Sequence, residues 1–98
     1  MKKPDKDEVI ITDHAYRRGK ERLGLSKKSI EKMALISFTT GRTADKLPKQ
    51  LRQYLVKLQM RHDKNAIIRI YGNHIFVFVN NILLTIFLLP NDYKKYLK

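Results

Sequence analysis

The stretch AIIRIYGNHIFVFVNNILLTIFLL, residues 66–89, decides the fold class. It consists of three apolar runs rich in Ile, Val and Phe, residue types that are enriched in β-strands. Two polar dipeptides, Gly72-Asn73 and Asn80-Asn81, separate the runs, and both tolerate the positive φ of tight hairpin turns. The sequence therefore predicts a three-stranded antiparallel sheet. Its strands are expected at residues 66–71, 74–80 and 82–89.

The last of these runs, ILLTIFLL, is apolar on both of its faces. Strands that are buried on both sides of a sheet have this composition. Helices laid on one face of the sheet would supply one covering layer. The other layer is expected from the C-terminal tail, the N-terminus or a second protein chain.

Three helices are expected before the sheet. Thr12 or Asp13 is a suitable N-cap for the first helix, and Ser26 for the second, which closes at Gly41. Asp45 can cap the third helix. The apolar positions of that helix share one side and are Leu47, Leu51, Tyr54, Leu55 and Leu58.

These elements predict an α+β fold, with N-terminal helices packed on one face of a C-terminal three-stranded antiparallel sheet. A single domain is expected over residues 9–98, after a disordered, charged tail of residues 1–8. The chain has no cysteine, which excludes disulfides and thiolate metal sites. No apolar signal segment is evident, and no run approaches the ~20 residues that span a bilayer. We therefore expect a cytoplasmic protein without membrane contact.

The charge balance indicates the class of partner. The chain carries 21 Lys and Arg against nine acids, a net charge of +12. Such a field attracts polyanions, because neutralised phosphates release condensed counterions. Nucleic acid, above all RNA, is the expected partner, although an excess of lysine can also serve solubility alone.

One segment of the first helix, TDHAYRRGKERLGLS at residues 12–26, carries side chains suited to phosphate chemistry. His14, Arg18 and Arg22 are spaced four apart, so they line one side of the helix and border its apolar stripe. That spacing predicts a position at the rim of a cleft between helix and sheet. Arg17 lies further around the helix and faces solvent, where it is expected to bind nucleic acid.

Metal-independent RNA cleavage needs these residue types. A base must take the 2′-hydroxyl proton, an acid must protonate the leaving oxygen, and cations must stabilise the charged phosphorane. Histidine carries protons near neutral pH, and arginine forks match phosphate oxygens. The plain alternative is a charged surface on which Arg17 and Arg18 pair with Glu21, and His14 packs or caps the helix.

The sheet region adds four candidates. Thr85 interrupts the last apolar run and is expected to share a face with Leu83 and Phe87. Its hydroxyl could orient phosphate or histidine, although threonine is also an ordinary strand residue. The other three candidates are predicted to bind nucleic acid and are Arg69, Tyr71 and His74. His62, at the end of the third helix, is expected to interact with the terminal carbonyls.

The string HAYRRGKERLGLS has the pattern H-A-x-x-R-x-x-x-R-x-G-x-S. It resembles the opening motif of small bacterial and phage proteins related to ribonuclease toxins of the RelE and colicin-nuclease type. The stretch IRIYGNHIFVFVNNILLTIFLLP is similar to the sheet half of that group, including a threonine in the final strand.

That resemblance implies a RelE/barnase-like architecture with a metal-free ribonuclease site between helix and sheet. The positions that match the family pattern are His14, Arg18, Arg22 and Thr85. The tail, NDYKKYLK, departs from the Arg-plus-Tyr/His arrangement of the better-known toxins, although Tyr93 and Tyr96 could substitute in part.

The leading hypothesis is a metal-independent, toxin-type endoribonuclease that cleaves or binds RNA without a cofactor. A neutralising antitoxin, a host protein or a second copy of the chain are its possible protein partners. The first alternative is a non-catalytic, basic nucleic-acid-binding regulator of a phage or mobile element. The second is a counter-defence protein that inhibits a host nuclease by protein–protein contact.

Overall fold

The computed structural model describes residues 8–97. Four α-helices and five strands make up these residues, together with two short 3₁₀ segments, and the α+β class is confirmed. In chain order the elements are β1 (Ile10–Ile11), α1 (Asp13–Leu23), α2 (Lys27–Thr40), β2 (Arg42–Thr43), η1 (Ala44–Lys46), α3 (Lys49–His62), β3 (Ile67–Tyr71), β4 (His74–Val79), β5 (Ile82–Leu88), α4 (Asn91–Lys94) and η2 (Lys95–Leu97).

The three predicted strands form the centre of the sheet as an antiparallel meander, β3-β4-β5. Gly72 and Asn80 both have positive φ, of 61° and 56°, in the two hairpin turns, as their residue types favour. The predicted total of three strands is wrong, because the sheet has five, in the order β1-β5-β4-β3-β2. β1 adds parallel to β5 and β2 adds antiparallel to β3. Two-residue strands are too short to show alternation, so the sequence carried no signal for them.

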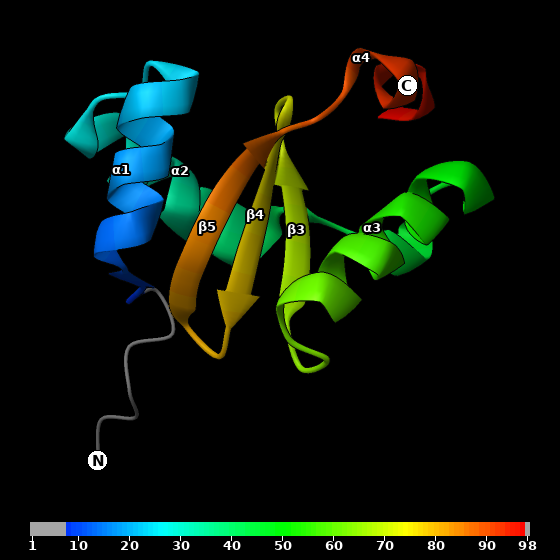
Figure 1. Ribbon diagram of the computed structural model, residues 1–98, viewed down its shortest axis with the longest axis horizontal. Coiled ribbons are helices and arrows are strands. Elements are labelled where there is room, and N and C mark those ends of the chain that lie inside the picture. Colours follow the sequence, from blue (N-terminus) through cyan, green and yellow to red (C-terminus); the bar gives the residue numbers. More distant parts are fainter. Residues whose placement is uncertain (1–7, 98) are drawn as a thin grey trace.

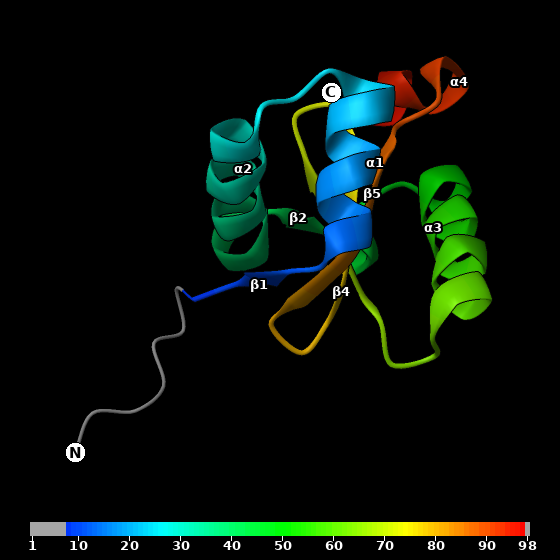
Figure 2. The ribbon, with the colours of Figure 1, turned by 60° about the vertical axis from the view of Figure 1, so that its left-hand side comes forward.

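The helices cover both faces of the sheet, which corrects the prediction of a single helical layer (Figures 1 and 2). α2 and α3 lie on opposite faces, and α1 runs beside β5. The tail that contains α4 and η2 lies on the α3 side, where Tyr93, Tyr96 and Leu97 pack against the core. The second covering layer is therefore supplied by α3 and by this tail.

The core consists of two clusters separated by the sheet. The cluster on the α3 side contains Leu51 and Leu55 with Ile68, Ile75 and Val77. The cluster on the side of α1 and α2 is centred on four large side chains that are fully buried or nearly so. They are Ile30, Phe76, Phe78 and Ile86.

A β-bulge in β5 decides which side chains face which cluster. Thr85 lies opposite Val77, whereas Leu83 lies opposite Phe78, so Leu84 is the extra residue on β5. Leu83 therefore belongs to the α1–α2 cluster, and Thr85 lies on the α3 face with Phe87. The expectation that Leu83 shares the face of Thr85 is wrong, because it assumed unbroken alternation.

The helix starts follow capping chemistry in α1 and α2 but not in α3. The hydroxyl of Thr12 accepts from Ala15 N at 3.1 Å, and that of Ser26 accepts from Ser29 N at 3.1 Å. α3 has Pro48 at its N-cap position and no side-chain cap, since Asp45 belongs to the preceding 3₁₀ turn. The predicted disordered tail lies outside the described residues except for Glu8, whose carbonyl accepts from Asn81 Nδ2 at 3.2 Å.

Candidate functional site

Two contacts fix α1 in place, one against β5 and one against α2, and they orient its basic side. Thr12, the N-cap, also places its hydroxyl 3.0 Å from the carbonyl oxygen of Leu83 and 3.1 Å from that of Leu84, at the bulge. Further along α1, Gly19 is buried, and a Cβ there would lie only 2.7 Å from Ile30 Cδ1. Because Ala15 and Gly19 are the buried positions of the helix, the residues just before them lie at the border of the packed side.

The basic residues of the predicted motif share one small hollow on the surface. It has a volume of about 130 Å³ and is lined by α1 alone. Arg18 is half-buried, whereas the other lining side chains are exposed. Glu21 lies among the cations, so the carboxylate of the ion-pairing alternative is also present. The lining residues are His14, Arg17, Arg18, Glu21 and Arg22.

Arg18 connects this hollow to the α3 face of the sheet. Its guanidinium carbon lies 5.2 Å from the ring centroid of Phe87 on β5. The ring of His62, at the end of α3, lies 5.5 Å from the same Phe87 ring at an interplanar angle of 50°. One aromatic side chain is therefore flanked by an arginine from α1 and a histidine from α3.

His62 is the functional candidate that sequence reasoning missed. Partial burial lowers its pKa below the usual 6.5, and the positive charges of Arg61, Arg18 and His14 act in the same direction. Both Arg18 and His14 are thus close enough to influence it electrostatically. The sequence predicts only an interaction with terminal carbonyls for His62, and its neighbours in the chain give no other signal. The packing of α3 on the β5 face is what brings it to the motif.

Two polar atoms near this site are buried without a hydrogen-bond partner among residues 8–97. They are Thr85 Oγ1 and Arg18 Nε. Thr85 is only 2% exposed and lies two residues before Phe87 on the same face of β5. Buried polar groups are usually paired, so each unpaired one needs an explanation, and a role in catalysis is one such explanation.

The three predicted nucleic-acid-binding residues of the sheet lie elsewhere. Arg69 pairs with Phe76 and Tyr71 pairs with His74, so all three alternate onto the face opposite Thr85. Arg69 lies near Asp45 and the end of α2. Burial, and then the charge of Lys94, lower the pKa of His74. The structure therefore does not bring these residues to the hollow on α1.

Residues 8–97 contain neither a cluster of metal ligands nor a membrane-spanning helix. No group of three or more His, Asp or Glu side chains is arranged to hold a metal ion there. No helix in this part of the chain is both long enough and apolar enough to cross a membrane.

Comparison with known proteins adds no family. Neither protein-family models, nor curated protein sequences, nor solved structures gave a match to this chain.

Proposed function

We propose that the protein is a metal-independent endoribonuclease of toxin type with a RelE/barnase-like architecture. The motif at residues 12–26, which resembles the opening motif of such toxins, supports this proposal. The observation that supports it most is the position of two histidines around Arg18. His14 lies four residues before it on α1, and His62 of α3 contacts the same Phe87 ring as Arg18. Cleavage by this route requires a base and an acid at once. A single histidine could not serve as both in one step.

The lowered pKa of His62 supports one division of the two roles. A base must be unprotonated to accept a proton, and the lowered pKa of His62 favours its neutral form. His14 is then left as the acid that protonates the leaving group. Arg18 and Arg22 hold the scissile phosphate, because guanidinium forks match its oxygens.

The proposed reaction is an internal transesterification. His62 takes the proton of the 2′-hydroxyl, and the 2′-oxygen forms a bond to phosphorus. The bond from phosphorus to the 5′-oxygen breaks, and His14 gives that oxygen a proton. The products are a 2′,3′-cyclic phosphate and a 5′-hydroxyl, and the arginines stabilise the negative charge of the phosphorane between them.

Replacing Arg18 by alanine tests this proposal. We expect cleavage of single-stranded RNA in the presence of EDTA to fall by about 10²–10³-fold, because a preorganised cation at the phosphorane is lost. The measurement is the rate of appearance of 2′,3′-cyclic phosphate ends, at a temperature where circular dichroism shows both proteins folded.

Lys32→Ala is the matched control, since it removes one exposed positive charge from α2, away from the hollow. We expect it to cleave within about twofold of the wild type, because exposed single charges contribute little on their own. Equal rates for the Arg18 and Lys32 variants would contradict the proposed site. RNA binding without any cleavage by the wild type would instead support the nucleic-acid-binding alternative.

Thr85→Val separates a structural from a functional role of the buried hydroxyl. Removing an unpaired buried hydroxyl should raise the free energy of unfolding by about 1 kcal/mol. Cleavage should nevertheless fall by about 10-fold, because the hydroxyl could no longer form the hydrogen bond to phosphate or histidine that the proposal assigns to it in the RNA complex. Urea unfolding and single-turnover cleavage measure the two effects. A more stable variant with full activity would leave Thr85 only a packing role.

A further inference from the structure

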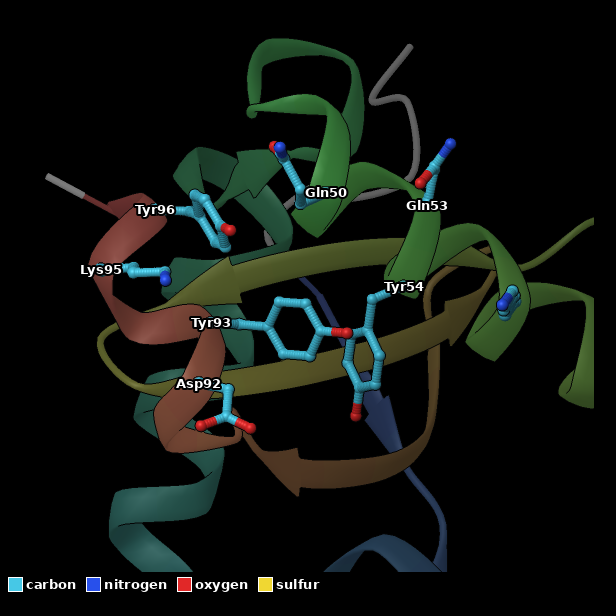
Figure 3. A pocket seen from close by; sticks show the side chains of 8 residues that line it. Gln50, Gln53, Tyr54, Asp92, Tyr93, Lys95 and Tyr96 are labelled. Atoms are coloured by element: carbon cyan, nitrogen blue, oxygen red, sulfur yellow. The ribbon is translucent and has the colours of Figure 1, made fainter.

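A cluster of three tyrosines lies apart from the hollow on α1. It surrounds a depression of about 430 Å³ between α3 and the C-terminal helical turns (Figure 3). A depression of this size is within the ~300–1,000 Å³ range of ligand pockets. Its lining residues are Gln50, Gln53, Tyr54, Lys57, Asp92, Tyr93, Lys95 and Tyr96, which we call the tyrosine groove.

Three half-buried rings form the floor of the tyrosine groove. Tyr54 and Tyr93 stack with centroids 4.6 Å apart and planes 26° apart, and Tyr93 and Tyr96 are tilted at 6.2 Å. Figure 3 shows Tyr93 lying between the other two rings. The C-terminal turns that carry Tyr93 and Tyr96 are also attached to β2, because Arg42 Nη1 donates to the carbonyl oxygen of Leu97 at 2.6 Å. The rings are therefore held in place before any ligand binds.

The charges around the rings indicate what the groove would accept. Lys57 and Lys95 are exposed, and Lys95 Nζ lies 5.3 Å from the Tyr96 ring centroid. Asp92 would repel a phosphate from the floor, yet its carboxylate and the two glutamine amides can pair with the polar edge of a ring. A flat, neutral, hydrogen-bonding ring with phosphates beside it meets these conditions.

We infer that the tyrosine groove binds a nucleobase of single-stranded RNA, stacked on the tyrosines, with Lys57 and Lys95 contacting the flanking phosphates. Stacking on aromatic side chains and a positive rim are how single strands are commonly bound. The inference rests on the proposed function for the identity of the strand. Tyr54 precedes His62 by eight residues on the same helix, which is about 12 Å along its axis. One strand could therefore reach both places.

The chain supplies its own reporter for the test. It has five tyrosines and no tryptophan, and three of the five line the groove. More than half of the tyrosine side chains therefore report on this region. The probe is a short, fully 2′-O-methylated oligoribonucleotide, which cannot be cleaved because it lacks the attacking hydroxyl.

With this probe, we expect saturable quenching of wild-type fluorescence. Tyr93→Ala should weaken binding by about 5- to 100-fold, as the loss of one stacked base does. Tyr16→Phe removes a fluorophore outside the groove and should leave the Kd unchanged. Because Tyr93→Ala could loosen the tail, a second variant replaces only the exposed lysines 57 and 95 with glutamine. This variant should make the slope of log K against log salt less negative by about 0.7 for each phosphate that the protein no longer neutralises.

The outcomes separate this inference from the proposed function. No binding by the wild type, or binding that neither variant changes, would overturn the inference, whether or not RNA is cleaved. Variant-sensitive binding without any cleavage of ordinary RNA would support the groove and remove the nuclease. Cleavage of RNA together with binding that neither variant changes would support the nuclease and overturn the groove.

Discussion

His62→Ala is expected to lower RNA cleavage by about 10²–10⁴-fold, because it removes the proposed general base. The effect should be as large as that of His14→Ala, although only His14 belongs to the sequence motif. The measurement is single-turnover cleavage of an RNA oligonucleotide. Met60→Ala, on the last turn of the same helix and 70% exposed, is the control and should keep its activity.

A change of leaving group distinguishes the two histidines. In a nucleoside 3′-(4-nitrophenyl) phosphate, the departing nitrophenolate needs no proton from an acid. The His14→Ala variant should therefore regain most of its rate on this substrate relative to RNA, whereas the His62→Ala variant should stay slow. The reverse pattern would exchange the two roles, and equal losses on both substrates would contradict acid–base catalysis by this pair.

The pH dependence follows from the same assignment. A base acts in its neutral form, so the rate on the nitrophenyl substrate should rise with pH with a midpoint below pH 6.5, because the pKa of His62 is lowered. In the unfolded chain His62 takes up its proton at the ordinary pKa of 6.5. Between the two values the unfolded state binds more protons, so stability falls as the pH drops through that window. Rates there must be corrected for the folded fraction.

The meander could be predicted from sequence because each part of it has a local cause. Apolar, β-branched runs favour strands, and Gly72 and Asn80 accept the positive φ that the turns require. β1 and β2 could not be predicted, since each consists of two residues that pair only because their neighbours position them. The bulge at Leu84 was hidden for a related reason, because the apolar residues around it suit either face.

His62 shows why half of the candidate site could not be predicted. The apolar stripe of α3 could be buried equally well against either face of the sheet. It therefore predicts that this side of α3 is buried, but not which face of the sheet it covers. Only when α3 lies opposite α2 does its last turn come to Phe87 and to Arg18. The double apolar face of β5 was the one available signal. It required a second layer, and assigning α3 to that layer would have placed His62 beside β5.

Gly41→Ala is expected to cause the largest loss of stability from a single added methyl group, about 3 kcal/mol. The backbone of Gly41 has φ −65° and ψ 155°, which any residue adopts, so its need for glycine is one of space. A Cβ would collide with the carbonyl oxygen of Ser37 and lie 3.0 Å from Arg69 Cβ. The first neighbour is a backbone atom of α2, and the second is attached directly to the backbone of β3. Neither can move aside by a side-chain rotation, so α2 and β3 would have to separate.

Gly72→Ala is the matched control, because glycine is favoured there by its backbone conformation and not by lack of space. Gly72 has a φ of 61°, but a Cβ added there would have no neighbouring atom within 4 Å, so only backbone strain of about 1 kcal/mol is expected. Urea unfolding should therefore give Gly41→Ala a much lower free energy of unfolding than Gly72→Ala. Thermal unfolding should show a fall in Tm of more than about 10 °C for Gly41→Ala. Equal losses of unfolding free energy in the two variants would mean that α2 and β3 move apart with little loss of packing. Because Gly41 lies on the face opposite Phe87 and His62, the fraction of Gly41→Ala that stays folded should cleave RNA at the wild-type rate, which separates this defect of the fold from a defect of the site.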